Sequence, residues 1–170
     1  MSKAFTRESD DAPDLPLPVR PLSALPPGAR NYLTPVGAQH LREELERLAQ
    51  GERPGLAGAT DDADAKRALA ALDRRIAQLE ESLRTAVIVP PPEPPWDQVR
   101  FGATVTVRDR EGVEDRFRIV GVGETDLDRD WVSWISPIAK ALLNARIGQS
   151  VRFRVPAGER EVEITEVTYE

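Results

Sequence analysis

A run of five prolines divides this chain of 170 residues, and it limits the fold more than any other feature. In "VIVPPPEPPWDQV" the prolines lie between Pro90 and Pro95. Proline has no backbone N–H and its ring clashes with the preceding helical turn, so a helix cannot continue through the run. Such a run favours a stiff, extended spacer. We therefore expect a Pro-rich linker over residues 89–98, with a folded module on each side.

Composition excludes several classes of protein. Residues 1–30 combine acidic residues with prolines and few apolar side chains, which predicts a disordered, Pro-rich tail. The chain has no cysteine, so it has neither disulfides nor a thiolate metal site. It shows no secretory signal and no apolar run near the roughly 20 residues of a membrane helix, which predicts a soluble cytoplasmic chain without a membrane partner. The formal charge of -6 argues against unaided binding to bulk nucleic acid and favours a protein partner with a basic surface.

Before the linker, residues 31–88 show the apolar periodicity of two helices. Thr34 can cap the first helix, and Pro35 suits its first position, where a missing N–H costs nothing. This helix is expected to end or kink near "GERPGLAG", since proline and glycine are poor helix residues. Apolar side chains at spacings of three and four form a stripe in each helix: Leu41, Leu45 and Leu48 in the first, and Leu69, Leu72, Ile76, Leu79 and Leu83 in the second.

The two stripes predict an antiparallel coiled-coil hairpin over residues 31–88, with its tip near residues 57–64. Two helices of an ordinary bundle are the alternative interpretation, but the sequence offers no third apolar helix to complete one. The tip segment "GATDDADAKRAL" contains Asp61, Asp62 and Asp64. These carboxylates could assist a Mg²⁺ ion, and they are also typical of a solvated turn or a helix start, where they interact favourably with the helix dipole.

After the linker, residues 99–170 alternate apolar and polar residues over strand lengths, and glycines separate the strands. The one helical candidate is "SPIAKALLNAR", in which Ser136 can cap the helix and Pro137 occupies its first position. We expect a small antiparallel sheet bent around this helix, which makes the whole chain α+β. The expected strands lie in "ATVTVRD", "EDRFRIVGV", "WVSWI", "SVRFRVP" and "REVEITEVTY".

Several of these blocks together resemble the Gre family of bacterial transcription elongation factors, most closely its GreB branch. The similarity covers most of the chain from residue 31 to the end, except the hairpin tip. It implies an N-terminal coiled-coil hairpin and a C-terminal FKBP-like domain, residues 99–170, that binds polymerase. The stretches that carry it are "NYLTPVGAQHLREELERL", "LDRRIAQLEESL", "FGATVTVRDREGVEDRFRIVGV", "VSWISPIAKALLNARIGQSV" and "VPAGEREVEITEVTY".

The resemblance also implies a function. In the family, the C-terminal domain grips RNA polymerase at the rim of its secondary channel, and the hairpin enters that channel. Tip carboxylates then help the polymerase hold a second Mg²⁺, which activates water for cleavage of backtracked RNA. This chain would accordingly be a monomer that partners bacterial RNA polymerase and meets nascent RNA and DNA only within the transcription complex. It would have no catalytic residues and no cofactor of its own, and no stably bound metal beyond the shared Mg²⁺.

The tip departs from the family pattern. GreB-like tips resemble Gly-Asp-Arg-Ser-Glu-Asn-Ala-Asp-Tyr, whereas this chain has Ala65 after its last aspartate, and its carboxylates do not keep the family register. Each arm also lacks roughly a heptad, about 10 Å of reach at 1.5 Å per residue. The sequence therefore leaves two modes open, stimulation of RNA cleavage and modulation of elongation by occupying the channel.

Two further groups of residues have both a functional and an ordinary interpretation. Ser136 and Pro137 match the family's Ser-Pro turn, which faces the polymerase rim in the relatives, and they also make an adequate helix start in any protein. The second helix also carries four cationic residues. They could form a basic face toward nascent RNA, or a solvated helix face with ion pairs: Lys66, Arg67, Arg74 and Arg75.

A different class of function is suggested by the FKBP-like fold alone. A peptidyl-prolyl isomerase is the alternative to a polymerase regulator, although fold does not determine function. No aromatic-lined pocket can be read from the few aromatic residues of the second module, and Trp131 and Trp134 are more typical of a core than of a stacking platform. His40, the single histidine, lacks a metal-ligand partner and is expected at the surface.

Overall fold

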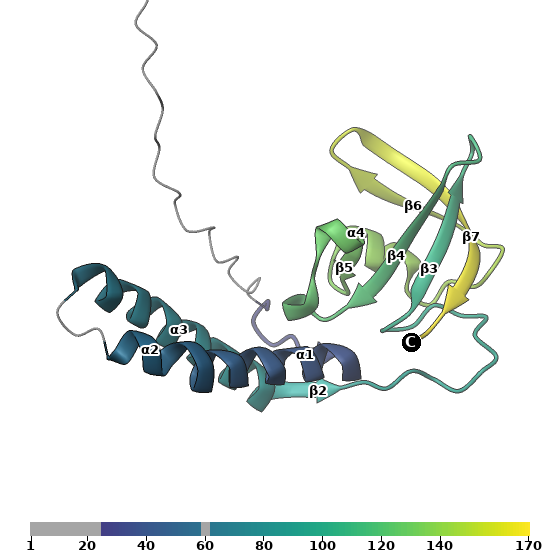
Figure 1. Cartoon of the computed structure of the whole chain (residues 1–170). Helices are drawn as coiled ribbons and strands as arrows, with labels where there is room; N and C mark the ends of the chain where they lie inside the picture. Colours follow the sequence, from purple (N-terminus) through teal and green to yellow (C-terminus); the bar gives the residue numbers. More distant parts are fainter. Residues whose placement is uncertain (1–24, 59–61) are drawn as a thin grey trace, which may run out of the picture.

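The computed structural model describes residues 25–58 and 62–170, and Figure 1 shows a helical N-terminal part followed by a curled β-sheet. Most of the predicted tail, residues 1–24, lies outside the described residues, as does Asp61 of the predicted tip. The first described residues form a turn, in which the Ala29 N–H donates to the Pro26 carbonyl over 3.0 Å. Within the described ranges, none of the helices combines the length and the apolar character that crossing a bilayer requires.

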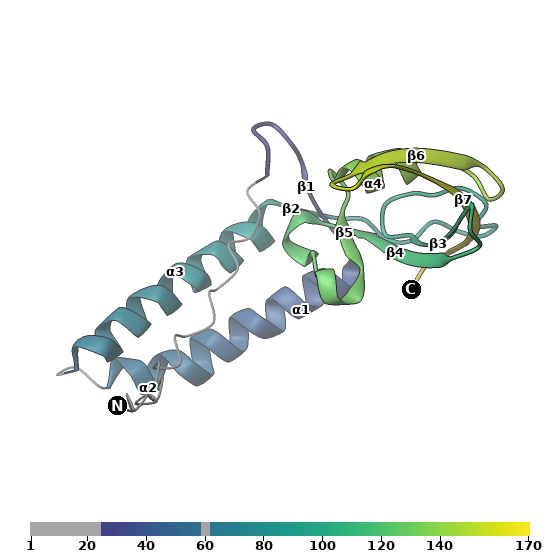
Figure 2. The same cartoon turned by 90° about the horizontal axis from the view of Figure 1, so that it is seen from above.

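The helical part is an antiparallel hairpin (Figures 1 and 2). Its first arm consists of α1 (Pro35–Glu46), the π-helical turn η1 (Arg47–Glu52) and α2 (Arg53–Ala57), and its second arm is α3 (Ala63–Thr85). Thr34 caps α1 as predicted. Most of the predicted stripes meet between the arms: Leu41, Leu48, Leu72 and Leu79 are buried with Leu33 and Ala38, and Leu45, Ile76 and Leu83 are partly buried against them.

The first arm ends within "GERPGLAG", as the sequence predicts, although Pro54 itself does not break the helix. Instead, η1 widens the helix by one residue, and the Arg53 N–H donates to the Leu48 carbonyl five residues earlier. Pro54 explains the wider turn, because its ring would clash with the carbonyl four residues earlier in a regular α-helix. The arm then continues for one more turn and ends at Ala57, with Gly58 as its cap.

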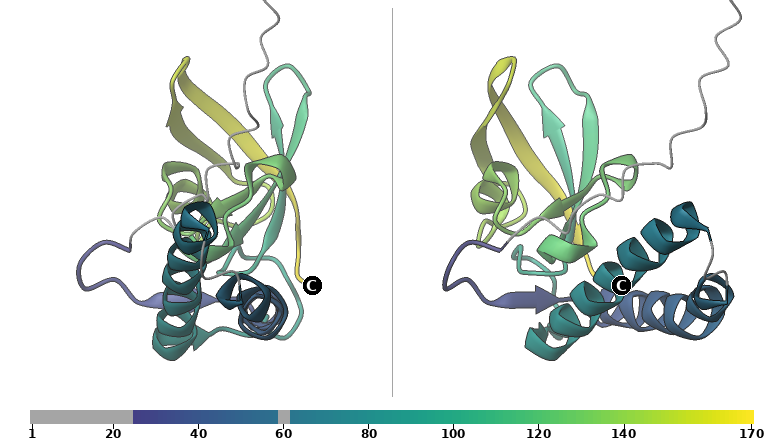
Figure 3. Two further views of the ribbon diagram at one scale, coloured as in Figure 1. Left: turned by 60° about the vertical axis from the view of Figure 1, so that its left-hand side comes forward. Right: turned by 90° about the vertical axis from the view of Figure 1, so that its left-hand side faces the viewer.

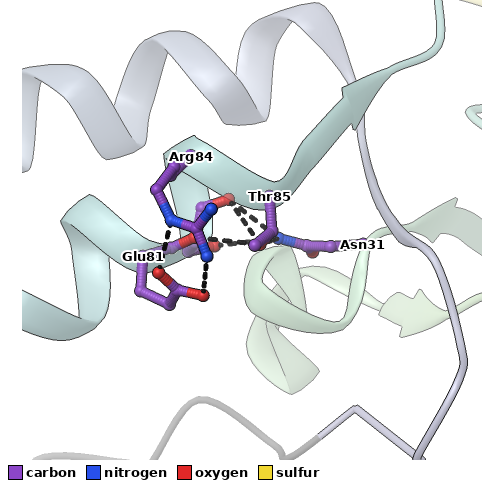
Figure 4. A network of polar contacts seen from close by, with 5 residues as sticks. Asn31, Glu81, Arg84 and Thr85 are labelled. Atoms are coloured by element: carbon purple, nitrogen blue, oxygen red, sulfur yellow. Dashed lines mark hydrogen bonds and ion pairs between the residues drawn. The ribbon is translucent and has the colours of Figure 1, made fainter.

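A short parallel pair of strands, which sequence reasoning missed, joins the two ends of the hairpin. β1 (Asn31–Leu33) pairs with β2 (Ala86–Ile88). The Asn31 amide nitrogen also donates to the Ser82 carbonyl over 2.8 Å and to the Thr85 hydroxyl over 3.2 Å (Figure 4). It thereby adds a partner to a carbonyl in the last turn of α3, which also accepts the Thr85 hydroxyl over 3.4 Å. We call this strand pair the clasp, because it holds the start of the first arm beside the end of the second.

The C-terminal part is a five-stranded sheet in the order β5-β4-β3-β7-β6, and it curls against the short helix α4 (Figures 1 and 3). Every strand of this sheet overlaps a predicted stretch, and β7 begins two residues before its stretch. The bounds are β3 (Thr104–Asp109), β4 (Glu114–Val120), β5 (Trp131–Ser133), α4 (Pro137–Leu142), β6 (Ser150–Val155) and β7 (Gly158–Thr168). The core between the sheet and α4 consists of buried apolar side chains, among them Val105, Val107, Ile119, Leu142 and Ile164.

One strand pair contradicts the predicted antiparallel sheet. β5 runs parallel to β4, with Arg118 opposite Trp131. The connection between them contains two 3₁₀ turns, η2 (Val122–Glu124) and η3 (Leu127–Arg129), which carry the chain back along β4 before β5 begins. Alternation of apolar and polar residues identifies the two faces of a strand but not its direction, so the direction follows from the connection.

The Pro-rich linker is anchored to the sheet at its C-terminal end. The Trp96 ring lies 5.5 Å from the Tyr169 ring, and the Trp96 indole N–H donates to the Pro92 carbonyl over 2.9 Å. The Tyr169 hydroxyl accepts the Arg100 N–H over 3.0 Å and donates to the Gln98 carbonyl over 3.1 Å. These contacts attach the end of the linker to Tyr169, which directly follows β7.

Candidate functional site

The tip of the hairpin carries two acidic residues at the end that lies far from the sheet (Figure 1). Asp62 has an extended backbone, and its carboxylate accepts the Asp64 N–H over 2.9 Å, so it caps α3. Asp64 pairs with Arg67 over 2.9 Å, and their side chains are 84% and 80% exposed. Because interactions this exposed contribute little to stability, both carboxylates could exchange their local partners for a cation.

Carboxylate oxygens at such a tip suit Mg²⁺, which often binds through one or two carboxylates and keeps several waters. In the part of the chain that the structure describes, no three acidic or histidine side chains come together as a metal site. The two described tip carboxylates can supply one or two of the oxygen ligands that such an ion takes.

The four predicted basic residues lie on different sides of α3. At about 100° per residue, Lys66 and Arg75 lie roughly 180° apart around the helix. Lys66, Arg67 and Arg74 are exposed, and the Arg74 guanidinium donates to a carbonyl one turn earlier over 3.2 Å. Arg75 instead joins the two arms, because its guanidinium donates two hydrogen bonds of 2.8 and 3.0 Å to the Glu44 carboxylate on α1. Arg67 and Arg74 share a side of the helix, and both are exposed while they make these local contacts.

The hairpin also carries an ion pair near the clasp, visible in Figure 4. The Arg84 guanidinium donates to Glu81 over 2.8 and 2.7 Å in the last turns of α3. This hydrogen bonding lowers the pKa of the Glu81 carboxyl and raises the pKa of Arg84. Both side chains are strongly exposed, so solvent screening limits what the pair adds to stability.

The predicted docking turn lies between β5 and α4. Ser136 caps α4, since its hydroxyl accepts the Ala139 N–H over 3.2 Å. Pro137 occupies the first helical position and is exposed. Just before the turn, the Trp134 ring lies 5.2 Å from the Tyr32 ring of β1 in an edge-on arrangement. The turn thus presents its proline to solvent and adjoins the clasp.

An open cavity of about 270 Å³ lies beside β5. Its one aromatic ring, Trp131, lies beneath the guanidinium groups of Arg118 and Arg129, at 4.8 and 5.4 Å. A pocket for a proline side chain would need apolar walls, so this cavity does not support the prolyl isomerase alternative. The lining residues are Thr104, Arg116, Arg118, Arg129, Asp130, Trp131 and Glu170.

Sequence reasoning missed one residue where the hairpin meets the sheet. The buried carboxylate of Glu124, in η2, accepts hydrogen bonds from the N–H and the hydroxyl of Thr34, which caps α1. Gly37 could have indicated this contact from the sequence. Glycine is unfavourable inside a helix, so its presence near the start of α1 suggests that another group packs closely there. His40 is exposed, as predicted. Trp134 is partly buried and packs against the core, as predicted, whereas Trp131 is half-buried and lies outside that cluster.

Comparison with known proteins assigns the chain to a family. A family model described as "Transcription elongation factor, GreA/GreB, C-term" matches residues 93–169. Transcription elongation factor GreB of Neisseria meningitidis serogroup B is 40% identical over 154 residues, which cover 82% of this chain and 94% of the relative. The chain belongs to the GreA/GreB family. Transcription elongation factor GreA of Nautilia profundicola is 34% identical over 152 residues, which cover 81% of this chain and 94% of that GreA.

Two solved GreA/GreB relatives are similar along most of the chain. The transcription elongation factor GreA/GreB of Nitrosomonas europaea is 27% identical, with 82% of this chain and 100% of that chain covered and a TM-score of 0.42. GreA factor homolog 1 (Gfh1) of Thermus thermophilus is also 27% identical, with 82% and 99% covered and a TM-score of 0.40.

The chain is shorter than its GreB relative within the region that they share. The alignment with Neisseria GreB is 154 positions long but covers only 82% of the 170 residues of this chain. Roughly 15 positions of the alignment therefore have no counterpart here. A deficit of this size equals about two helical heptads.

Proposed function

We propose that this chain regulates transcription elongation by binding bacterial RNA polymerase at its secondary channel. The observation that carries the proposal is the position of Asp62 and Asp64, at the end of a helical hairpin far from the sheet, in a chain 40% identical to a GreB. A projecting arm with an acidic end suits a channel whose lining is basic, because opposite charges favour insertion.

The two parts of the chain have separate roles in this function, docking and insertion. Residues 99–170 form an FKBP-like domain that docks at the channel rim, with Ser136 and Pro137 in contact with the polymerase. Residues 31–88 form a coiled-coil hairpin that enters the channel, and residues 89–98 connect the two. The chain acts as a monomer and is not itself an enzyme, since the chemistry belongs to the polymerase.

The tip would contribute to that chemistry only through carboxylate oxygens. A second Mg²⁺ in the polymerase active centre would supply the attacking water for RNA cleavage, and Asp61, Asp62 or Asp64 would hold part of its coordination shell. Exposed Arg67 and Arg74 lie behind the tip, where they could contact nascent RNA.

Channel occupancy, rather than strong stimulation of cleavage, is the mode that we favour. If the roughly 15 missing positions are shared between the arms, each arm is about 10 Å shorter than in the Neisseria relative, at 1.5 Å per residue. A metal ligand displaced by even a few ångströms does not coordinate. The chain would then compete with longer elongation factors for the channel.

RNA cleavage by stalled, backtracked polymerase complexes tests the proposal. We expect the wild type to stimulate cleavage at least about tenfold less than a full-length GreB, and to inhibit that GreB in competition. A variant with Asp61, Asp62 and Asp64 all changed to Asn should still compete, since docking belongs to the sheet domain and the acidic tip only assists insertion. The matched control changes three exposed carboxylates of the sheet to amides: Glu111, Glu159 and Glu163.

Two outcomes would contradict this interpretation at different levels. Strong cleavage by the wild type that is lost in the triple Asn variant but kept in the control would show that the tip reaches the active centre. Failure of the wild type to bind polymerase or to compete with GreB would refute the proposed function itself.

A further inference from the structure

A carboxylate lies buried between the hairpin and the sheet. Glu124 in η2 is only 9% exposed. Its Oε2 accepts the Thr34 N–H over 3.0 Å and the Gly121 N–H over 2.9 Å, and its Oε1 accepts the Thr34 hydroxyl. Hydrogen bonds to a carboxylate are among the stronger ones in proteins. Two donors from the hairpin side and one from the sheet side therefore hold this group in one position.

Thr34 links Glu124 to the helix of the first arm. Its hydroxyl oxygen accepts the Gly37 N–H over 2.9 Å while the hydroxyl donates to Glu124. The first turn of α1 is thereby tied to the sheet through a relay of two hydrogen bonds. The carboxylate also lies at the N-terminal end of the α1 dipole, where negative charge is favourable. The direction of α1 is thus fixed by a residue of the C-terminal part.

Two glycines make room for this arrangement. A Cβ atom on Gly37 would lie 1.7 Å from Oε1 of Glu124, and a Cβ on Gly121 would lie 2.1 Å from the Tyr32 carbonyl oxygen. Both distances are far below van der Waals contact. The helix and the η2 turn therefore approach as closely as they do only because both residues lack a side chain.

The other contacts at this junction are less directional. The Tyr32 ring lies 5.7 Å from Phe101 and 5.2 Å from Trp134, in tilted and edge-on arrangements. Aromatic contacts of this kind tolerate a range of angles. The hydrogen bonds of Glu124 do not, because they weaken steeply as donors move out of line.

We propose that Glu124 is a positioning residue that sets the angle at which the hairpin leaves the sheet domain. The consequence for transcription rests on the proposed function. α3 has 23 residues, which makes the arm about 34 Å long, so a rotation of about 10° at its base moves the tip by roughly 6 Å. A single carboxylate at the base thereby controls where the tip arrives inside a docked polymerase.

A distance measurement on the free protein tests the proposal without polymerase. The chain has no cysteine, so Ala68→Cys near the tip and Glu111→Cys in the β3–β4 turn allow two spin labels to be attached at exposed sites. Pulsed electron resonance then gives the distribution of label distances. We expect one narrow distribution for the wild type, and a distribution at least about twice as broad, or displaced, for Glu124→Ala.

Gly37→Ala provides an independent variant that does not depend on Glu124→Ala folding. Alanine favours the helix more than glycine does, but its methyl group must push the carboxylate away. The matched control is Gly51→Ala, where a Cβ meets nothing within 4 Å. A broadened or displaced distribution in Gly37→Ala, with a cooperative unfolding transition retained and Gly51→Ala unchanged, would support positioning over a loss of fold.

The second measurement concerns polymerase. In the variants we expect affinity for polymerase, and with it competition against a long GreB for binding, to stay within about threefold of the wild type, while the effect of the inserted tip on elongation falls about tenfold. Unchanged distance distributions in both Glu124→Ala and Gly37→Ala would overturn the proposal. Absence of polymerase binding by the wild type would instead refute the proposed function, and the distance result would stand.

Discussion

Single polar side chains hold this molecule together where its elements meet. Asn31 fastens β1 to the last turn of α3, Arg75 joins the two arms of the hairpin, and Tyr169 anchors the linker to the sheet. Each of them is buried or half-buried. Removing such a group leaves its partner without a hydrogen bond in a place that water reaches poorly, which costs about 1–3 kcal/mol.

Tyr169 gives a pH-dependent prediction at this scale. Burial raises the pKa of its hydroxyl above the ordinary value of 10.0, and the hydrogen bond from the Arg100 N–H offsets part of the rise. Because the folded state favours the neutral phenol, this stabilisation is fully present below about pH 10 and is lost as the pH rises through the folded-state pKa. We expect Tyr169→Phe to be about 1 kcal/mol less stable than the wild type at neutral pH and less sensitive to pH above 10.

Denaturant unfolding at neutral and alkaline pH measures both effects. Tyr32→Phe is the control, since Tyr32 is the only other tyrosine of the chain. Parallel stability curves for the wild type and Tyr169→Phe across the alkaline range would show that Tyr169 does not cause the pH dependence.

At the scale of the elements, the hairpin is held by a narrow apolar seam. The arms are in register where Arg75 on α3 meets Glu44 on α1, and buried leucines lie on both sides of that ion pair. Outside the seam the arms are mostly exposed. The length of such a hairpin can therefore change by whole heptads as long as both arms change together.

A lengthened hairpin provides the corresponding prediction. Duplicating residues 41–47 in the first arm and 72–78 in the second repeats both the leucine seam and the Glu44–Arg75 ion pair. Each arm gains about 10 Å, so we expect stimulation of RNA cleavage to rise at least about tenfold over the wild type. The measurement is transcript shortening in backtracked complexes. Lengthening one arm alone is the control, and equal activity of both variants would contradict the reasoning from reach.

The long elements could be predicted from the sequence, whereas the features that orient them could not. The apolar periodicity marked α1 and α3, and the alternation over strand lengths marked β3, β4, β6 and β7. The clasp strands have three residues each, too few to show alternation, and their pairing depends on residues 55 positions apart. The parallel direction of β5 and the burial of Glu124 both depend on η2, an irregular turn without periodicity.

In the candidate site, cap positions such as Thr34 and Ser136 were predictable because capping is local.

At the scale of the whole molecule, the acidic tip and the Ser-Pro turn lie in different parts of the fold. The tip is the far end of the hairpin, whereas the turn belongs to the sheet and adjoins the clasp (Figures 1 and 2). Changes at one should therefore leave the other intact. This separation predicts that binding to polymerase and action on RNA can be altered independently.

Pro137→Asp in the full chain tests this separation. Pro137 is exposed at the first position of α4, where an acidic residue interacts favourably with the helix dipole, so the fold should persist. We expect affinity for polymerase to fall about tenfold, as measured with fluorescently labelled protein, because a charge replaces an apolar contact. Val113→Asp is the control, since Val113 is 53% exposed in the β3–β4 turn. Residues 99–170 alone should also bind, and binding confined to residues 1–88 would contradict the prediction.

The clasp has a consequence for how such proteins diversify. Because β1 and β2 lie side by side, the hairpin departs from the rest of the fold and rejoins it at one place (Figure 2). Paired deletions between them leave the sheet, its core and the Ser-Pro turn unaltered. The length of the hairpin can therefore change during evolution while the proposed docking turn stays the same. After a gene duplication, a few in-frame deletions would be enough to turn one copy of a long elongation factor into a short competitor of the other.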